Sequence, residues 1–379
     1  MAKFKSMGYN VLHIIPDVGE GYSWPELSRW LDEAERLDLW IMFDMRHQYQ
    51  DPAWISRIVP MIAKRPNMLL WYTSDEPDGN EEPFLAPQRA YKQIKDLDPY
   101  HPISLCLNCE NWHFSDYASG ADILLSDTYP IGTNTTFSSV WQTECNTTYG
   151  DCGCDNCHGI DDITNIADRF DIWRAFQAQL GWSQKPLWTV PQAFGPEMYW
   201  RRPSSEEIVA MNMIAINHGA KGSVAWMWPT SEELIRPTSS LARVLTDPDV
   251  VRYTLGADLI RKGFDVKGTT LLDVAAWIVP NQGMLVSVVN TAHEDIREGI
   301  SIVLPIDRTE TTETEKIWLG DSGWQLASGS PQGAGITLVS STAIKGMAVT
   351  LLTIGTVPRS SEVLTLPVGN TADQQSVTS

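Results

Sequence analysis

The sequence is most informative from Leu69 to Gly79, which reads Leu69-Leu70-Trp71-Tyr72-Thr73-Ser74-Asp75-Glu76-Pro77-Asp78-Gly79. The first residues of this stretch, preceded by Met68, form a short apolar run typical of a buried strand. The run ends at two adjacent acids, Asp75 and Glu76, followed by the turn residues proline and glycine. The pattern therefore predicts a buried strand that presents two carboxylates at its carboxyl end.

Six further apolar runs alternate with amphipathic, helix-like segments, and this alternation is typical of βα units around a parallel sheet. Capping boxes at Ser23 and Ser204 mark the starts of two of the predicted helices. We expect an α/β fold of the TIM (β/α)8-barrel class. The seven predicted strands are Asn10–Ile15, Leu39–Asp44, Met68–Thr73, Pro102–Leu107, Asp122–Ser126, Pro186–Pro191 and Ser223–Trp228. Because a closed barrel has eight strands and the residues before Asn10 resemble the end of a helix, the predicted barrel lacks its first strand.

The pattern changes after Gly263 to short alternating strands broken by glycine, proline, asparagine and aspartate. This change predicts a small antiparallel β-sandwich. The expected organisation is a barrel over residues 1–263, a sandwich over 264–356, and a disordered polar tail over 357–379.

Six cysteines lie close together, and an even number in one region favours disulfides in an oxidising compartment. They are Cys106, Cys109, Cys145, Cys152, Cys154 and Cys157. A zinc knuckle that uses His158 is the competing interpretation, but it lacks a separated second pair of ligands. Two glycosylation sequons, at Asn134 and Asn146, also favour a glycosylated, secreted protein. The chain opens without a signal segment, and we expect the numbered sequence to be truncated.

The composition narrows the range of partners. A formal net charge of -19 repels phosphate backbones and anionic lipid, so neither nucleic acid nor a membrane is expected as a partner. Sixteen tryptophans suit both a packed core and stacking on sugar rings. The sequence contains no phosphate-binding glycine loop, serine nucleophile elbow or paired-histidine zinc motif, and we expect no metal and no organic cofactor.

The two acids at the end of the Met68–Thr73 strand are the candidate catalytic groups. Barrel enzymes place their active sites at the carboxyl ends of the strands. Because adjacent carboxylates repel, one of them should keep its proton near neutral pH and act as a general acid. We assign that role to Glu76, with Asp75 assisting it. In the alternative interpretation, Asp75 merely caps the next helix in a surface turn.

The Asp75-Glu76-Pro77 motif after a barrel strand resembles the fourth-strand acid site of (β/α)8-barrel glycoside hydrolases. The resemblance extends from Asn10 to Pro229, and its further motifs are Asp127-Thr128-Tyr129-Pro130, Pro191-Gln192-Ala193-Phe194-Gly195, His218-Gly219-Ala220-Lys221-Gly222 and Trp226-Met227-Trp228. It implies an enzyme that hydrolyses O-glycosidic bonds and has a carbohydrate as its substrate.

One position departs from that pattern. Retaining barrel glycosidases of the largest clan carry a nucleophilic glutamate at the end of the seventh strand, where this chain has Gln192. An amide cannot form the glycosyl ester, and three mechanisms remain open. The substrate's own acetamido group attacks with Asp75 orienting it; or Asp127 or Asp44 activates water in an inverting reaction; or Glu197 approaches from the following loop as the nucleophile.

Polar and aromatic residues at the predicted strand ends are candidates for binding sugar. The substrate-binding residues that we predict are Asp44, His47, Asn108, Tyr129, Gln192, Trp226 and Trp228, with His13, Asp17 and Arg46 as further candidates. A different class of function, a non-catalytic carbohydrate-binding barrel, is suggested by the missing seventh-strand glutamate.

Overall fold

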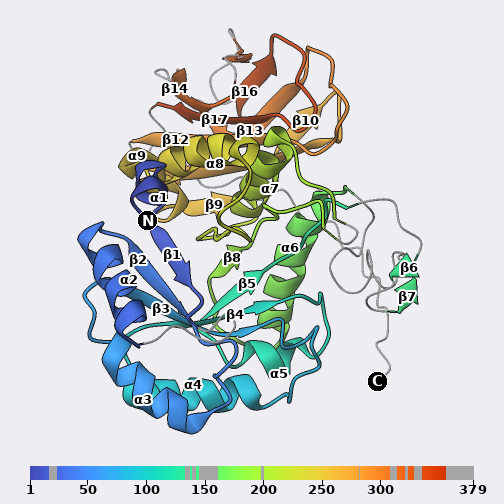
Figure 1. Ribbon diagram of the computed structural model, residues 1–379. Helices are drawn as coiled ribbons and strands as arrows, with labels where there is room; N and C mark the ends of the chain where they lie inside the picture. Colours follow the sequence, from blue (N-terminus) through green and yellow to red (C-terminus); the bar gives the residue numbers. More distant parts are fainter. Residues whose placement is uncertain are drawn as a thin grey trace.

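The computed structural model describes residues 1–16, 24–132, 137–138, 142–144, 161–197, 200–280, 282–307, 314–320, 323–327 and 335–355. It consists of a curled parallel sheet wrapped by helices and of an antiparallel β-sandwich that packs beside it (Figure 1).

The curled sheet contains the predicted strands in their predicted order. Six strands pair in parallel in the order β1-β2-β3-β4-β5-β8. The segment from Ser223 to Trp226 continues the sheet beyond β8 through parallel bridges to Thr189 and Gln192. The strands are β1 (Val11–Ile14), β2 (Trp40–Asp44), β3 (Met68–Asp75), β4 (Ile103–Leu107), β5 (Ile123–Ser126) and β8 (Leu187–Thr189).

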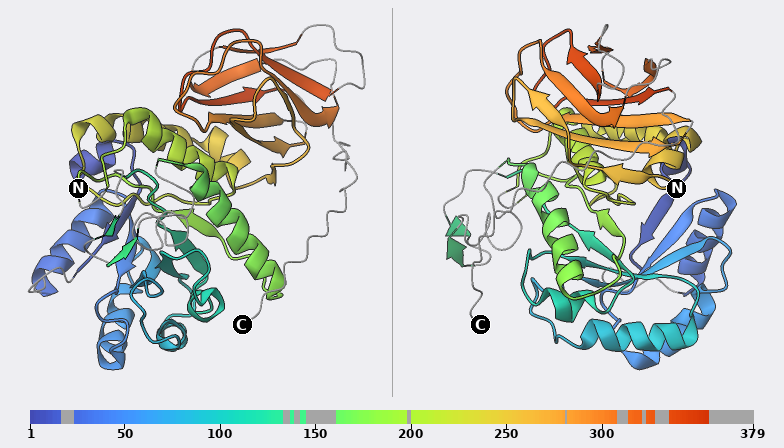
Figure 2. Two further views of the ribbon diagram at one scale, coloured as in Figure 1. Left: turned by 90° about the vertical axis from the view of Figure 1, so that its right-hand side faces the viewer. Right: turned by 180° about the vertical axis from the view of Figure 1, so that it is seen from behind.

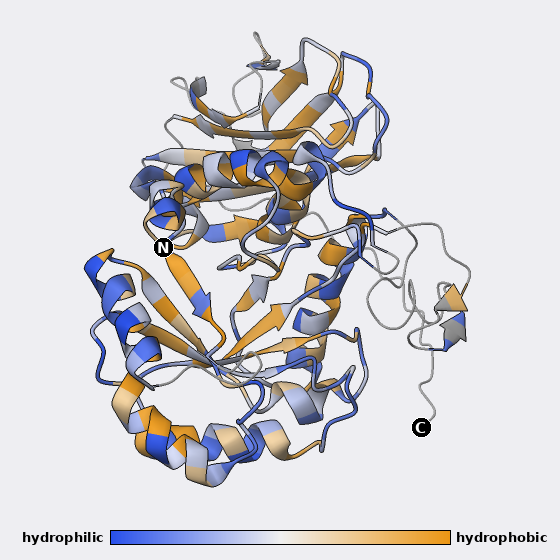
Figure 3. Ribbon diagram, viewed as in Figure 1, coloured by the Kyte–Doolittle hydropathy of each residue, from blue (hydrophilic) through white to orange (hydrophobic). Residues whose placement is uncertain are grey.

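Helices follow the strands and cover the convex face of the sheet (Figures 1 and 2). Their starts are set locally, since Asp51 caps α3 and Ser204 forms the predicted capping box with Glu207 at the start of α7. The strands are largely hydrophobic, whereas the helices mix polar and apolar residues (Figure 3). The helices are α1 (Ala2–Ser6), α2 (Trp24–Arg36), α3 (Pro52–Ile62), α4 (Ala86–Leu97), α5 (Phe114–Ala118), α6 (Thr164–Gln179), α7 (Ser205–Asn217), α8 (Glu232–Leu245) and α9 (Pro248–Thr254).

The barrel has seven parallel strands among the described residues, as the sequence predicts. Helix α1 packs against α8, where Ser239 donates a hydrogen bond of 2.7 Å to Met7 O and Tyr9 contacts Thr238 at 2.6 Å. In an eight-stranded barrel, the helices of the first and last βα units are neighbours in the same way. The position without a strand therefore lies between the Ser223–Trp226 segment and β1.

The second unit is the predicted sandwich of two antiparallel sheets. One sheet has the order β10-β13-β16-β15 and the other has the order β14-β17-β12-β11-β9. Its strands are β9 (Asp258–Ile260), β10 (Asp265–Lys267), β11 (Leu272–Val279), β12 (Gly283–Asn290), β13 (Ser301–Asp307), β14 (Thr314–Leu319), β15 (Trp324–Leu326), β16 (Gly335–Ser340) and β17 (Val349–Ile354). A separate two-stranded sheet pairs β6 (Phe137–Ser138) with β7 (Thr143–Glu144). Because β9 pairs with β11, the antiparallel unit begins before the boundary predicted at Gly263.

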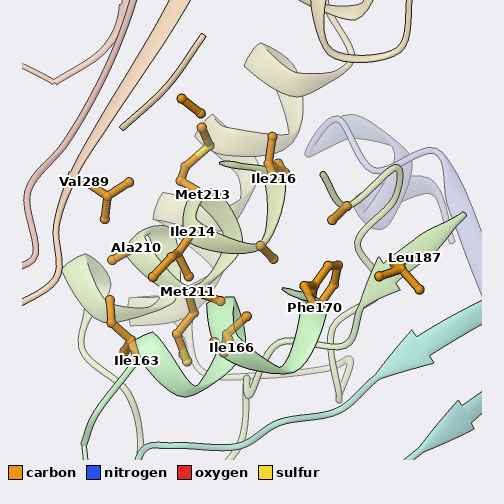
Figure 4. Packing of buried hydrophobic residues seen from close by; sticks show 14 of the residues in the cluster. Ile163, Ile166, Phe170, Leu187, Ala210, Met211, Met213, Ile214, Ile216 and Val289 are labelled. Carbon is orange, nitrogen blue, oxygen red and sulfur yellow. The ribbon is translucent and has the colours of Figure 1, made fainter. Parts of the chain in front are cut away.

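The five-stranded sheet is buried on both faces, which joins the two units. Alternate residues of β11 point to opposite sides: Ala276 packs inside the sandwich and Trp277 packs against the barrel helices. Helix α7 lies in this junction, where its Met211, Ile166 of α6 and Val289 of β12 belong to one hydrophobic cluster (Figure 4). The sandwich is therefore anchored to the barrel by a continuous hydrophobic core.

The disulfide prediction is wrong for two of the six cysteines. Cys106 and Cys109 are buried thiols at the end of β4. Cysteine is among the residues most often found in cores, and Cys106 contributes to the apolar interior of the barrel. The other four cysteines, both sequons, the Ser23 capping box and the 357–379 tail lie outside the described residues. Among those described, no helix combines the length and the apolar character that a membrane span requires.

Candidate active site

The carboxyl ends of the parallel strands surround a cavity of about 220 Å³. Four acidic residues at or after the ends of three strands line it: Asp75, Glu76, Asp127 and Glu197. Aromatic rings make up much of the remaining wall. The lining also includes His13, Arg46, Tyr72, Cys106, Leu125, Tyr129, Val190, Phe194, Trp200, Val224, Ala225 and Trp226.

Backbone geometry at the end of β3 sets the position of the Asp75–Glu76 pair. Tyr72 pairs with Ser104 and Asp75 pairs with Cys106, so β3 holds one more residue than β4 between these positions. Such a bulge redirects side chains next to active sites. Glu76 has a positive φ of 48°, and its N–H donates a hydrogen bond of 3.1 Å to Cys106 O. A left-handed glutamate is a strained conformation that surrounding contacts must hold in place.

Arg46 fixes Asp75 from the neighbouring strand end. Its guanidinium donates to Asp75, whose other oxygen accepts from the Tyr72 hydroxyl. The same guanidinium donates from Nε to Asp44 Oδ2 at 2.8 Å, and His13 Nε2 contacts that oxygen at 2.7 Å. Burial alone would lower the pKa of Arg46, but Tyr72 and the carboxylates of Asp44 and Asp75 raise it above its usual value. Arg46 is thus a permanent cation at the edge of the cavity.

Asp44 lies behind this cation rather than in the cavity lining. Its side chain is buried, and its Oδ1 accepts a hydrogen bond of 2.8 Å from the Arg46 N–H. Burial alone would raise the pKa of Asp44, but hydrogen bonds and charges from His13 and Arg46 outweigh it and hold the pKa below its usual value. Asp44 therefore positions His13 and Arg46.

Cys106 and Tyr129 line the cavity together with the buried carboxyl group of Asp127. Burial, together with the charge of Asp127, raises the pKa of both the Cys106 thiol and the Tyr129 hydroxyl well above their usual values. Asp127 is only 2% exposed at the end of β5. The Cys106 thiol and the Tyr129 hydroxyl therefore stay protonated near neutral pH.

An aromatic cluster forms the wall beyond β8. The ring centroids of Tyr129 and Phe194 are 5.0 Å apart, and those of Phe194 and Trp200 are 5.2 Å apart. On another side, the Arg46 guanidinium lies 5.1 Å from the Trp226 ring centroid. Glu197 is exposed in the loop after β8, and its N–H donates a hydrogen bond of 3.0 Å to Trp200 O. Flat rings beside carboxylates are the surfaces that sugar rings and hydroxyls require.

Five of the ten predicted site residues line the cavity: Asp75, Glu76, Asp127, Tyr129 and Trp226. The other five do not. Trp228 packs against Phe4 and Tyr9, His47 is exposed in the turn after β2, Asn108 is buried beside Asp78, and Asp44 lies behind Arg46. Asp17 lies outside the described residues.

Gln192 is the fifth, and its side chain is fully buried and directed at the backbone. Its Nε2 donates hydrogen bonds of 2.8 Å to Ile131 O and 2.9 Å to Arg201 O, and its Oε1 accepts one of 3.1 Å from Ile131 N. The amide therefore joins two loops of the cavity wall.

Tyr72, Phe194 and Trp200 are the aromatic cavity residues that the sequence prediction missed. Strand alternation contains the signal for Tyr72, because it shares a face with Leu70, which packs inside the barrel. No local pattern marks Phe194 or Trp200, since the path of the loop after β8 places them. The described residues contain no group of three or more acidic, histidine or cysteine side chains suited to a metal ion.

Comparisons with known proteins agree with this fold. No protein-family model matches the chain, and no curated protein matches it. The matching solved structures include an alfa-galactosidase from Saccharomyces cerevisiae with raffinose, with a TM-score of 0.55, 10% identity, and coverage of 93% of this chain and 90% of that one. A family 39 glycoside hydrolase from the gut symbiont Bacteroides cellulosilyticus WH2 matches with a TM-score of 0.53, 9% identity, and coverage of 93% and 77%. The chain spans 58% of the length of a beta-galactosidase from the psychrophilic Marinomonas ef1, matching 68% of its own length with a TM-score of 0.46 and 12% identity.

These structural neighbours are barrel glycoside hydrolases, so the resemblance in fold that the sequence indicates is confirmed. At such identities the likeness concerns the fold, and the assignment of chemistry depends on the residues of the cavity.

Proposed function

We propose that this protein is a glycoside hydrolase that cleaves O-glycosidic bonds of an oligo- or polysaccharide, with Glu76 as the general acid. The observation that carries the proposal is the convergence of Asp75, Glu76, Asp127 and Glu197 on one aromatic-walled cavity at the carboxyl ends of the strands. The fold likeness to barrel glycosidases supports it.

Asp75 assists as a fixed negative charge. One of its carboxylate oxygens accepts a hydrogen bond from Arg46, and the other accepts one from Tyr72. A carboxylate held beside Glu76 favours a proton on Glu76, because two adjacent carboxyl groups repel when both are ionised. Glu76 then gives this proton to the leaving glycosidic oxygen as the bond to the anomeric carbon breaks.

The second catalytic carboxylate in this proposal is Glu197. It is exposed to the cavity, whereas Asp127 is almost completely buried. It also comes from the loop after β8, which is separated from β3 in the sheet by β4 and β5. A sugar bound between these walls would have Glu76 and Glu197 on different sides. Asp127 then holds a sugar hydroxyl, and Tyr129 and Trp226 contact the ring.

The first experiment compares Glu76→Gln with wild type on a broad panel of aryl glycosides and natural glycans. The wild type should release reducing sugar, and the variant should lose at least a hundredfold in kcat on natural glycans, the usual contribution of a general acid. Glu35→Gln, which alters an exposed glutamate on α2, is the matched control and should keep full activity. Binding of glycan by both proteins without any cleavage by wild type would favour the non-catalytic carbohydrate-binding barrel instead.

The second experiment tests the partner of Glu76. Glu197→Gln should lose activity on an activated aryl glycoside, and azide should restore it with formation of a glycosyl azide. NMR of the first-formed anomer then reports retention or inversion. If Asp127→Asn lost activity while Glu197→Gln kept it, and the wild type gave an inverted product, the base would be Asp127. Inhibition by a thiazoline, with Glu197→Gln still active, would assign attack to the substrate's acetamido group.

A further inference from the structure

A second hollow lies on the same rim as the cavity, outside the proposed catalytic residues. Its volume is about 360 Å³, and its lining residues are Glu81, Glu82, Pro83, Phe84 and Trp112. They come from the loop after β3 and the loop after β4. The loop after β3 also lines the cavity, through Glu76, and Cys106 of β4 lines it too.

Two large aromatic side chains stand open in this hollow. Phe84 is 43% exposed and Trp112 is 48% exposed. Large exposed rings are costly unless they contact something, and two of them in one concave surface are an unusual arrangement.

The rings are held in place rather than loosely arranged. Phe84 stacks on His113 with centroids 4.0 Å apart, and Trp112 packs edge-on against the same His113 at 4.6 Å. His113 is anchored by a 3.0 Å contact with Asp116, and its φ of 47° is a left-handed conformation that few residues adopt. The packed rings of Phe84, Trp112 and His113 thus join both loops. They lose little conformational entropy when a ligand binds.

One carboxylate of the hollow, that of Glu82, is held by the loop after β2. Glu82 accepts hydrogen bonds from Tyr49 and, at 3.3 Å, from Gln50. Burial raises the pKa of Glu82 and outweighs the hydrogen bond from Tyr49, which lowers it, and the charge of Asp75 raises it further. Glu81 is exposed beside it, in a left-handed conformation with φ 51°.

We propose that this hollow is a remote subsite that binds a neutral glycosyl unit of the same glycan chain, with Trp112 and Phe84 stacking on the sugar and Glu81 and Glu82 accepting from its hydroxyls. This inference rests on the proposed function and extends it to a substrate class, a neutral oligosaccharide longer than a disaccharide. Two acidic residues and the absence of a basic one among the lining residues disfavour uronic or sulfated sugars.

The spacing along the chain is consistent with one continuous ligand. Four residues lie between Glu76 and Glu81, and five lie between Cys106 and Trp112. Even a fully extended chain of that length spans only about 20 Å, so a short oligosaccharide reaches from one hollow to the other.

The test measures, by calorimetry, the affinity of the Glu76→Gln protein for neutral hexasaccharides of glucose, xylose, mannose and N-acetylglucosamine. Adding Trp112→Ala should weaken the best ligand about tenfold, the loss expected for one stacked ring. Trp112→Tyr, which keeps a ring, should recover most of the affinity. Trp30→Ala, at 43% exposure on α2, is the matched control and should bind like the parent protein.

A kinetic comparison separates this inference from the proposed function. In an otherwise wild-type chain, Trp112→Ala should reduce kcat/KM about tenfold on the hexasaccharide but leave the rate on an aryl monoglycoside unchanged. Binding that depends on Trp112 without any cleavage refutes the hydrolase and keeps the subsite. If Trp112→Ala cleaves the hexasaccharide and the monoglycoside at the wild-type rates, the subsite is refuted and the hydrolase is kept. Failure of every hexasaccharide to bind refutes the subsite as well.

Discussion

The junction between barrel and sandwich contains a histidine whose charge should control stability at alkaline pH. His218, at the end of α7, contacts Asp273 of β11 through Nε2 at 2.9 Å and Asp171 of α6 through Nδ1 at 3.1 Å. Arg261 lies 2.8 Å from Nδ1 and opposes the charge. Burial disfavours protonation, but the two aspartates outweigh it and raise the pKa of His218 to about 9.

The sign and size of the effect follow from this shift. Because the folded pKa of His218 lies above its ordinary value of 6.5, protonation stabilises the folded state. The stabilisation is complete below pH 6.5 and is lost as the pH rises through 9. A shift of this size corresponds to about 3 kcal/mol.

Urea unfolding measured from pH 6 to 10 provides the assay. The free energy of unfolding of the wild type should fall by about 3 kcal/mol more than that of His218→Gln over this range. His47→Gln, which alters an exposed histidine, should follow wild type. Parallel profiles for wild type and His218→Gln would refute the reasoning, since they would mean that His218 does not titrate between the two aspartates.

Three further predictions concern the groups around the cavity. Gln192→Glu should destabilise the protein by about 3 to 5 kcal/mol in urea unfolding, because a buried carboxylate would face two carbonyl oxygens, and Gln192→Met should cost less. Arg46→Met should also cost about 3 to 5 kcal/mol, since it leaves Asp44 buried with less compensation, and adding Asp44→Asn should recover part of the loss. Burial raises the pKa of Asp78 to about 6, against the backbone hydrogen bonds it accepts, so its contribution to stability is present below pH 4 and is lost as the pH rises through 6. Asp78→Asn should therefore remove about 3 kcal/mol of pH dependence between pH 3 and 7 in the same assay.

The sequence predicts the barrel well because its strands are short apolar runs bounded by clear breaks. Each predicted strand corresponds to a parallel strand of the sheet within a few residues, and β3 extends two residues further than predicted. The extension follows from the bulge that admits Ser74 and Asp75 into the ladder, and periodicity alone does not reveal a bulge. Strand β9, which pairs with β11, has only three residues, too few for a pattern.

The candidate site was predicted in part, for a physical reason. A strand end tells which edge of the sheet a residue occupies, and Asp75, Glu76 and Asp127, which follow strand ends, all line the cavity there. It does not tell whether a polar side chain turns to the cavity or to a neighbouring loop. Asn108 and Gln192 occupy the expected edge, but both are buried among backbone groups of adjacent loops.

The orientation of Gln192 also bears on the missing seventh-strand glutamate. A carboxylate at this position would have to face the carbonyl oxygens of Ile131 and Arg201, which only a donor can satisfy. The amide thus fits the packing of the wall, and it holds the loop that carries Glu197 through Arg201. A nucleophile or base for this cavity must then come from a residue that projects past the wall. Among the described lining residues after β8, Glu197 is the acidic one, and activity that survived in Glu197→Gln without acetamido participation would contradict this reasoning.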